Sequence, residues 1–534
     1  MNAENNEQLW ERIEQLNTIG IALSAEQHTP RLLEMILLGA KRITQADGGS
    51  IYRVSKAKKE VQLEIMRTDS LNFAMGGTTG MPVPQKPIPL FRADGQPNDR
   101  FVVTTAVLQR KTIVIPDVYA AKEFDFSGTR EFDKKNNYRS RSFLTIPMMN
   151  HEHDVIGVLQ LINARDEATG EVVPFTDADR HLAKSLTSQA AMALTNRRLI
   201  DEQKKLFNSF IKLIAAAIDE KSPYTGAHCE RVPQLTKMLA EAADRAQTGA
   251  FKEFSLDEDR YYELEVASWL HDCGKITTPE HVMDKSTKLQ TIVDRIDAVC
   301  ERMEIVKRDA KVAMQERVIE ALQQGDDANL QARESKYNEL LAQLSDDQAF
   351  LRKHNSGGEF MRPEDQARVR QIAQYRWRNE QGDEQPLLSD DEIENLCISK
   401  GTLTDNERRV INNHVSATIK MLRSLPFPKA LRNVPEYAGS HHECPNGTGY
   451  PNKLSGEAFP IPGRIMAIAD IFEALTDNSR PYKKGMPISR ALKILELMKN
   501  DGKIDPGLFD LFVSEKIYLE YAKCYLNPAQ IDVA

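Results

Sequence analysis

The chain has 534 residues, of which 28% are charged and 41% hydrophobic, with a formal net charge of -8. This length predicts more than one domain, and the acidic balance argues against a general binder of nucleic-acid polymers or anionic membranes. No apolar run approaches the roughly 18 residues that a membrane-spanning helix needs.

The N-terminal residues and the cysteines indicate the compartment. Residues 1–8 are polar and lack the apolar core of a secretory signal. The six cysteines are scattered and form no Cys-x-x-Cys pair. We therefore expect reduced thiols rather than a disulfide framework, in a cytoplasmic protein.

The first predicted domain, residues 1–178, mixes helical and strand-like patterns. Apolar residues recur at helical spacing near the N-terminus, from Leu9 to Leu16 and from Leu32 to Ala40. Strand-like runs follow at residues 50–54, 112–115, 143–149 and 155–163. Helices that flank an antiparallel sheet give an α+β domain.

This region resembles a GAF domain. The matching features are the strands around 156–163, the segment Phe175-Thr176-Asp177-Ala178-Asp179, and a long helix that contains Gln189-Ala190-Ala191. Cyclic-nucleotide-binding GAF domains carry a fuller signature than this chain does. Here Asn163 precedes Ala164 and Asp179 precedes Arg180, which departs from that signature. The resemblance implies a sensor domain whose ligand is unknown, or a GAF fold used only for dimerisation or packing.

Residues 179–210 are predicted to form a connecting helix that continues to about Asp219. Apolar residues recur every seven positions, at Leu186, Ala193, Ile200, Phe207 and Ile214. A companion seam is polar at Gln189, Asn196 and Gln203 and ends in Phe210. This pattern is typical of a parallel two-helix coiled coil and predicts a homodimer. The alternative is one amphipathic helix that packs on its own domain.

The second half of the chain is predicted to be helical. Residues 211–285 and 402–534 are predicted to form one all-α domain, interrupted by the strongly charged residues 286–401. Heptad-spaced apolar residues between Ile292 and Ala313 and a second helical segment after Gly325 predict an inserted helical hairpin. We consider this insertion a candidate surface for a protein partner.

Two motifs carry the chemistry: His271-Asp272-Cys273-Gly274-Lys275, and the run from His441-His442-Glu443 to Gly447-Thr448-Gly449-Tyr450-Pro451. Adjacent His-Asp and His-His pairs suit metal ligation better than core packing, since a carboxylate can bridge two metals while its neighbouring imidazole binds one. Isolated candidates of the same type are His228, His414 and Asp470. Imidazole and carboxylate ligands suit Fe, Mn or Zn, so the sequence predicts a dinuclear metal hydrolase.

These motifs resemble the HD-GYP family of cyclic dinucleotide phosphodiesterases, over about residues 205–285 and 402–515. Pro462-Gly463-Arg464-Ile465 and Arg480-Pro481-Tyr482-Lys483 also match the family pattern. The resemblance implies an all-α domain placed behind a sensor such as a GAF domain.

The resemblance also implies roles for individual residues. One metal is expected at His228, His271, Asp272 and Asp470, and the second at Asp272, His414, His441 and His442, with Fe or Mn as the two divalent ions. Asp272 and Lys275 are the expected catalytic residues. Expected substrate contacts are Lys275, Gly447, Gly449, Tyr450, Arg464, Arg480 and Lys483.

The chain departs from the family pattern at several positions. Tyr224 stands where some members carry a Glu that binds a third metal, so we predict two metals. Cys444 replaces a residue that is often basic, and Glu473 one that is often Asp. The stretch before Arg480 is one residue longer than usual, and the insertion separates motifs that the family joins by a short segment.

The sequence therefore predicts a GAF-regulated phosphodiesterase that hydrolyses cyclic di-GMP to linear pGpG, with GMP as the further product to test for. One alternative is hydrolysis of 3'3'-cyclic GMP-AMP, for which Cys444 leaves room. Another is a catalytically silent, metal-binding receptor or scaffold in which the insertion occludes the pocket or recruits a partner.

Overall fold

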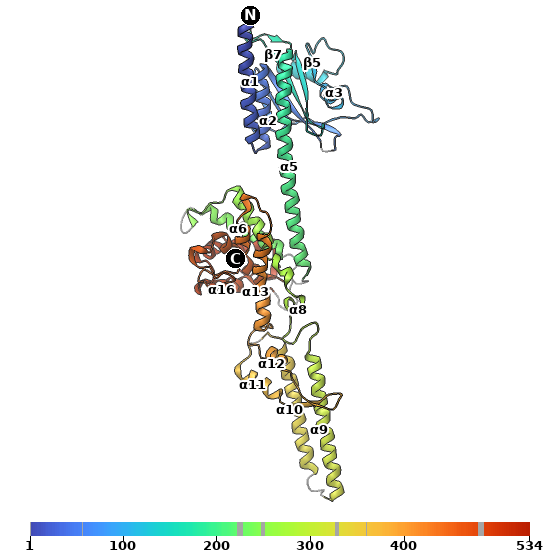
Figure 1. Ribbon diagram of the computed structural model, residues 1–534, viewed down its shortest axis with the longest axis vertical. Helices are drawn as coiled ribbons and strands as arrows, with labels where there is room; N and C mark the ends of the chain where they lie inside the picture. Colours follow the sequence, from blue (N-terminus) through green and yellow to red (C-terminus); the bar gives the residue numbers. More distant parts are fainter. Residues whose placement is uncertain are drawn as a thin grey trace. The chain divides into compact units, whose positions relative to one another are not determined.

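The computed structural model describes residues 2–55, 57–221, 228–246, 251–325, 330–358, 360–478 and 485–533. The chain divides into two compact units, Met1–Leu206 and Phe207–Ala534 (Figure 1). Among the described residues, no helix has both the length and the hydropathy that a bilayer-spanning segment requires.

An antiparallel sheet forms the centre of the first unit. Its strands follow the order β3-β2-β1-β7-β6-β5, while β4 pairs with β2 and β8 with β7. Their bounds are Ala46–Val54 (β1), Glu60–Thr68 (β2), Phe73–Gly76 (β3), Ile88–Pro89 (β4), Ile113–Ile115 (β5), Phe143–Met149 (β6), Val155–Arg165 (β7) and Val172–Val173 (β8). Leu159 of β7 lies opposite both Ile51 and Ile146, so the central strands align their apolar faces.

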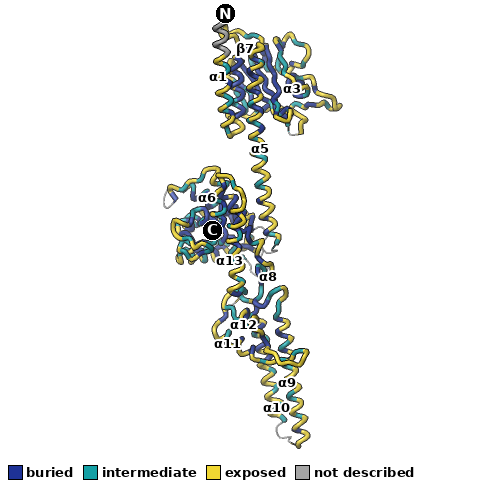
Figure 2. The backbone as a smooth tube through the Cα atoms, in the orientation of Figure 1, coloured by how far each residue is buried: buried dark blue, intermediate teal, exposed yellow. Residues whose placement is uncertain are grey.

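Helices cover both faces of this sheet. The helices α1 (Asn2–Ala25), α2 (Thr29–Thr44) and α5 (Asp177–Lys221) enclose one core with Leu159 and Leu161. The helix α3 (Val102–Gln109) covers the other face, and α4 (Ser127–Asn136) follows it in the chain. Because successive strand residues point to opposite faces, β7 supplies both cores and is buried along most of its length (Figure 2).

Helix α5 is a single helix of 45 residues that begins in the first unit and ends in the second. Thr176 and Asp179 cap its start reciprocally: the backbone N–H of Thr176 donates to Asp179 Oδ2 at 2.8 Å, and that of Asp179 donates to Thr176 Oγ1 at 3.2 Å. The absence of internal proline and glycine allows the helix to continue.

Part of the predicted heptad seam of α5 packs within the units themselves. Leu186 is buried in the first core, and Phe207 packs against the core of the second unit. Ile200, Phe210 and Ile214 of the predicted rows are exposed, and so is a further row one position earlier in the heptad, Met192, Leu199, Leu206 and Leu213. Exposed apolar residues that could pair with a second helix therefore remain on both rows of α5.

The second unit is helical, with one core that gathers residues from both ends of its sequence. Its longer helices are α6 (His228–Arg245), α7 (Glu258–Leu270), α13 (Asp405–Arg423), α15 (Ile461–Thr476), α16 (Ile488–Asn500), α17 (Pro506–Ser514) and α18 (Ile517–Tyr525). Shorter elements are η2 (Cys273–Thr277), α8 (Glu280–Met283), η4 (Lys429–Leu431), α14 (Val434–Ala438), η5 (Gly456–Ala458) and η6 (Pro528–Gln530).

The inserted segment contains more than the predicted hairpin. Helices α9 (Ile296–Gln324) and α10 (Leu330–Asn355) are followed by α11 (Pro363–Ile372), the strand pair β9 (Arg376–Arg378) and β10 (Glu384–Pro386), and α12 (Asp390–Leu396). These elements share a core of their own. At its root the chain returns to its point of departure, because the Thr402 hydroxyl donates to the Lys285 carbonyl at 2.9 Å.

Candidate metal centre

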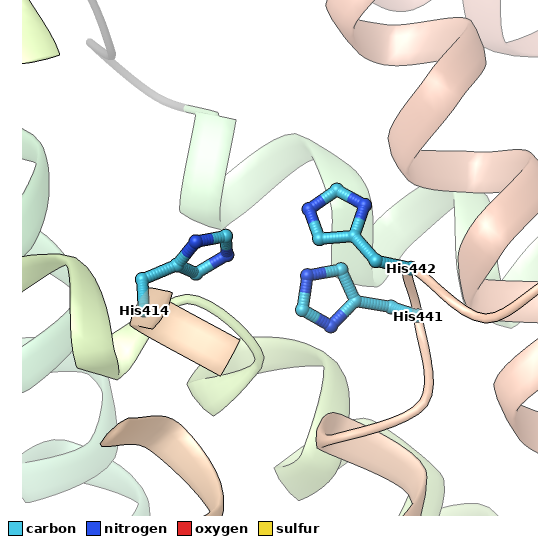
Figure 3. Close-up of side chains that lie close together, drawn as sticks. All are labelled: His414, His441 and His442. Atoms are coloured by element: carbon cyan, nitrogen blue, oxygen red, sulfur yellow. The ribbon is translucent and has the colours of Figure 1, made fainter. Parts of the chain in front are cut away.

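Seven side chains from separate elements converge in the second unit. His228 begins α6, and His271 and Asp272 directly follow α7. His414 lies within α13, and Asp470 lies within α15. His441 and His442 follow α14, and Figure 3 shows their rings turned toward His414. All seven ligand-type residues predicted from the sequence are thus brought together.

The carboxylate of Asp272 lies between two groups of imidazoles. Its Oδ2 is 3.3 Å from His228 Nε2 and 3.2 Å from His271 Nε2. Its Oδ1 is 3.2 Å from His414 Nε2 and 3.9 Å from His441 Nε2. Each oxygen therefore faces a different pair of rings, which is the arrangement of a carboxylate that bridges two cations.

Asp470 and His442 complete the two groups. Asp470 Oδ1 lies 3.3 Å from His228 Nε2 and 3.9 Å from His271 Nε2, on the first side of Asp272. His442 joins His414 and His441 on the other side, and one ligand atom from each lies within 4.8 Å of the others. Two adjacent sets of nitrogen and oxygen donors result.

Backbone carbonyls fix the orientation of three rings. The Nδ1 atoms of His271, His414 and His441 lie 2.7, 2.6 and 2.6 Å from carbonyl oxygens of the residues three positions earlier. Because a carbonyl oxygen only accepts hydrogen bonds, each Nδ1 carries the proton and each Nε2 is left with its lone pair. This tautomer is the one that a metal ligand requires.

His228 is oriented by a side chain instead. Its Nδ1 lies 2.5 Å from Oε2 of the buried Glu473, whose other oxygen is 2.8 Å from Arg231 Nε. Arg231 also pairs with Asp477 at 2.7 Å. The sequence identified Glu473 only as a departure from the family pattern, since its contact with His228 joins residues 245 positions apart.

Several donor atoms are suited to binding cations because no hydrogen bond within the fold satisfies them. In the described part of the chain, His271 Nε2, His414 Nε2, His441 Nε2 and Asp272 Oδ1 are buried polar atoms without a hydrogen-bond partner. Burying an unsatisfied polar atom costs about 1–3 kcal/mol. Four such atoms aimed at one another are explained if they hold metal ions.

The protonation states of three donors suit metal ligation. Burial and the neighbouring His442 and His271 hold the pKa of His441 well below its usual range. Burial also lowers the pKa of His442 to about 4. Burial alone would raise the pKa of Asp272, but the charge of Lys275 and the adjacent imidazoles hold it well below its usual range. Neutral imidazoles and an ionised carboxylate are the forms that bind metals.

His228 differs from these three donors. Burial disfavours its charged form, but Glu473 and hydrogen bonds with Asp272 and Asp470 raise its pKa well above the usual range. A cation at this position would displace the proton from Nε2, since metal and proton compete for the same lone pair.

The turn that carries Asp272 and Lys275 packs closely on α13. A Cβ atom on Gly274 would lie 2.0 Å from the carbonyl oxygen of His414 and 2.6 Å from the backbone nitrogen of Thr418. The Gly274 N–H donates to Thr418 Oγ1 at 2.9 Å, and that hydroxyl donates to the His271 carbonyl at 3.1 Å. Glycine is therefore needed where the two halves of the centre meet.

Lys275 directs its ammonium group to the bridging carboxylate. Its Nζ lies 2.6 Å from Asp272 Oδ2, and its side chain is 22% exposed. Burial would lower the pKa of Lys275, but the charge of Asp272 raises it. A protonated amine is thus held beside the cluster on a side that solvent reaches.

The Gly-Tyr-Pro segment folds back over the second group of histidines. Tyr450 stacks on His442, with ring centroids 4.9 Å apart and planes at 26°, and its N–H donates to the His442 carbonyl at 3.2 Å. A Cβ atom on Gly449 would lie 2.4 Å from the backbone nitrogen of Cys444, and Gly447 has a φ of +76°. Glycine at both positions permits this close return of the backbone.

Buried Glu443 holds the far end of this loop, a role that the sequence did not identify. Its carboxylate accepts hydrogen bonds from the backbone N–H groups of Asn452 at 2.6 Å and Leu454 at 2.9 Å. No local pattern distinguishes such a carboxylate from a metal ligand, since it lies beside two histidines within the same motif.

The remaining predicted contacts differ in position. The Arg464 guanidinium is engaged within the fold, with the Phe459 carbonyl at 2.7 Å, Asp505 at 2.9 Å and the Gly456 carbonyl at 2.6 Å. Arg480, Lys483 and Tyr224 lie outside the described residues. Cys444 is half-buried, and burial raises the pKa of its thiol.

Two domain families match the chain. The GAF domain matches residues 28–194, and the HD domain matches residues 390–508. The predicted fold class, an α+β GAF domain followed by a helical HD region, is confirmed. The HD match includes His414, His441, His442 and Asp470 but begins near the end of the insertion, which separates it from His228, His271 and Asp272.

Several curated proteins are similar to part of the chain. A 3'3'-cGAMP-specific phosphodiesterase 1 of Vibrio cholerae is 36% identical over 22% of this chain and 27% of the relative. A cyclic di-GMP phosphodiesterase of the same organism is 34% identical over 23% of this chain and 25% of the relative. The chain thus aligns with about a quarter of the length of these relatives.

One solved structure, of the GAF domain/HD domain protein from Geobacter sulfurreducens, is 16% identical. The alignment covers 33% of this chain and 98% of that one, with a TM-score of 0.23.

Proposed function

We propose that this protein, whose chain joins a GAF domain to an HD domain, is an HD-GYP-type phosphodiesterase that hydrolyses cyclic di-GMP to pGpG. The observation that carries the proposal is the bridging position of Asp272, with unsatisfied imidazole nitrogens on both sides. Phosphodiester hydrolysis at two adjacent cations is the chemistry for which such a donor set is suited.

Two divalent cations are the proposed cofactors, with Fe or Mn as the candidate metals. The first set of donors is His228, His271, Asp272 and Asp470, and the second is Asp272, His414, His441 and His442. When bound, such cations supply Lewis acidity toward phosphate oxygens and lower the pKa of water.

Asp272 and Lys275 are the proposed catalytic residues of the chain. Asp272 holds the two donor sets in register because each of its oxygens faces one set. Lys275 orients the Asp272 carboxylate through the 2.6 Å contact. Its ammonium group also supplies a positive charge where the scissile phosphate would enter, and such a charge stabilises the negative charge that develops on phosphate oxygens.

The Gly-Tyr-Pro loop is the proposed substrate contact on the side of His442. Tyr450 presents a half-buried aromatic ring that stacks on His442, and the close approach at Gly449 keeps the loop against the backbone of Glu443 and Cys444. Aromatic rings stack readily on nucleobases. Gly447, Arg464, Arg480 and Lys483 remain proposed contacts, with the last two outside the described residues.

The choice between two cyclic dinucleotides is a specific alternative. One relative is named for 3'3'-cGAMP and another for cyclic di-GMP, at similar identities of 36% and 34%. Cys444 occupies the loop position that distinguishes this chain from the basic family pattern. We place cyclic di-GMP first, and 3'3'-cyclic GMP-AMP is the second candidate substrate.

The assembly and compartment are also proposals. The exposed row on α5 supports a homodimer through that helix, because Met192, Leu199, Leu206 and Leu213 follow a heptad. The six cysteines are free thiols, which supports a cytoplasmic setting. The GAF domain is proposed to regulate hydrolysis through a ligand of unknown identity, and the separately folded insertion is proposed to offer a surface for a protein partner.

The direct test is turnover by the full chain loaded anaerobically with Fe or Mn. Cyclic di-GMP and 3'3'-cyclic GMP-AMP are incubated separately and in competition, and products are separated by liquid chromatography with mass detection. We expect pGpG from cyclic di-GMP. Asp272→Ala should abolish the reaction, whereas His281→Ala, an exposed histidine on α8, should retain it. Metal-replete protein that binds both dinucleotides but hydrolyses neither would instead identify a receptor.

A further inference from the structure

A pocket of about 440 Å³ lies in the first unit, away from the candidate metal centre. It is formed by the edge of the sheet at β5 and β6 and by the first turns of α5. The lining residues are Arg110, Lys111, Thr112, Val114, Ile146, Pro147, Met149, Arg180, His181, Lys184 and Ser188.

The charge of this pocket is opposite to that of the whole chain. Arg110, Lys111, Arg180 and Lys184 place four permanent cations on its lining, and the described residues that line it include no carboxylate. Arg180 also pairs at 3.1 Å with Asp177, a side chain that is itself 84% exposed. On a chain with a net charge of -8, such a concentration of positive charge attracts an anion.

A second pocket of the same unit provides the contrast. That pocket, of about 530 Å³, is lined by β1, β7, α2 and a later part of α5. Its cations are matched by carboxylates: Arg53 pairs with Glu64 at 2.7 Å, and Lys58 pairs with Asp154 at 2.7 Å. Balanced ion pairs stabilise a surface without requiring a ligand, whereas the basic pocket leaves most of its charge unbalanced.

The basic pocket is also shaped for more than a simple ion. Val114, Ile146, Pro147 and Met149 contribute apolar surface from β5 and β6. The cations come from two segments, the residues after α3 and the start of α5. A volume of about 440 Å³ lies within the roughly 300–1,000 Å³ of small-molecule sites. A ligand that satisfies both surfaces carries several negative charges and a flat or apolar group.

We propose that this pocket binds a nucleoside polyphosphate. The phosphates contact Arg110, Lys111, Arg180 and Lys184, and the base lies against the apolar surface of β5 and β6. Guanidinium groups pair well with phosphate because they donate two parallel hydrogen bonds, and lysine adds a point charge. This binding site is separate from the proposed hydrolysis of cyclic dinucleotides. It contributes no residue to that reaction, and binding here does not depend on the reaction.

The position of the pocket on α5 gives the site a regulatory character. Arg180, Lys184 and Ser188 are spaced four residues apart and therefore share one face of the helix. The same helix continues to Lys221 in the second unit. A ligand at the pocket would thus bind to the element that physically connects the two units.

The test is calorimetric titration of the full chain with ATP, pyrophosphate and adenosine. All titrations use chelator-treated Asp272→Ala protein, so that neither metal-dependent binding at the histidine cluster nor hydrolysis contributes. We expect ATP to bind more tightly than pyrophosphate and adenosine to bind weakest. The affinity for ATP should fall as salt is raised, since exposed charges are screened.

The double variant Arg180→Glu/Lys184→Glu should weaken ATP binding by at least about tenfold, because two attractions become repulsions. Lys205→Glu, an exposed position on the same helix outside the pocket, is the matched control. Circular dichroism checks that each variant is folded. Undetectable ATP binding at low salt, or equal affinities in the double variant and the control, would overturn the proposal. Equal affinities for ATP and pyrophosphate would overturn the role of the apolar surface.

Discussion

The carboxylate of Glu473 orients the ring of His228. Among the described histidines of the metal centre, this is the one orienting contact that a side-chain carboxylate makes. The atoms Oε2 and Nδ1 of this contact lie 2.5 Å apart, whereas the corresponding nitrogens of His271, His414 and His441 face backbone carbonyls. A carboxylate partner makes an imidazole a stronger donor than a carbonyl does. The two donor sets are therefore unequal, and the set with His228 depends on a side chain that mutation can change.

The first prediction concerns that side chain. Glu473→Gln keeps the size of the group but removes its charge, so we expect metal affinity at the His228 set to fall by about 10–100-fold. Metal release is followed by competition with a coloured chelator. Glu253→Gln, an exposed position, is the control. Unchanged release from Glu473→Gln would show that the contact does not tune the metal.

The second prediction concerns the bridging carboxylate. Asp272→Asn leaves a neutral amide between the two donor sets, so both sets lose their shared anionic ligand. We expect bound metal, measured by elemental analysis after gel filtration, to fall below one ion per chain. Circular dichroism should stay close to that of the parent. Retention of two ions by this variant would contradict the bridging role.

The third prediction is a loss of stability in mild acid. His442 has a pKa of about 4 in the fold, and that of His441 is also held low, against about 6.5 in the unfolded chain. The unfolded chain therefore binds more protons between these values. The contribution of these residues is fully present above pH 6.5 and is lost as the pH falls toward 4.

Urea unfolding of the chelator-treated protein at several pH values measures this effect. We expect the free energy of unfolding to fall by roughly 2–3 kcal/mol between pH 7 and pH 4.5 on account of His442. The difference should shrink in His442→Ala. The contribution of His228 has the opposite sign, because its raised pKa stabilises the fold below 6.5 and that stability is lost as the pH rises through the folded value. His228→Ala should therefore steepen the loss in acid, and an identical pH profile in all three proteins would refute the assignment.

The fourth prediction tests the junction between the two halves of the centre. A methyl group on Gly274 would collide with backbone atoms of His414 and Thr418, so the turn and α13 must separate. We expect Gly274→Ala to lower the free energy of unfolding by about 1–3 kcal/mol or more and to weaken metal binding. Gly128→Ala in α4 is the control, since nothing lies within 4 Å of its added Cβ. Equal stability of the two variants would contradict the packing argument.

The sequence revealed the ligand types but not their orientation. His271-Asp272 and His441-His442 are recognisable in the sequence as adjacent pairs. The structure brings these pairs together with His228, His414 and Asp470. The contact between Glu473 and His228 could not be predicted, because it depends on how α6 and α15 meet in space. A period of seven is visible in a sequence, but which of its positions face solvent depends on what each unit buries: Leu186 is buried, whereas Ile200 on the same row is 54% exposed.

One exposed heptad row of α5 leads to the last prediction. Leu199, Leu206 and Leu213 lie on one heptad row and are 48%, 58% and 64% exposed, and burial of such a leucine contributes about 1.5–3 kcal/mol. If two copies pair through this row, Leu199→Gln/Leu206→Gln should convert a dimer to a monomer in light scattering. The control Lys205→Gln should remain dimeric, because Lys205 lies outside the row. A parent chain that is monomeric at tens of micromolar would exclude pairing, whereas a dimer unaffected by the double variant would place the interface elsewhere.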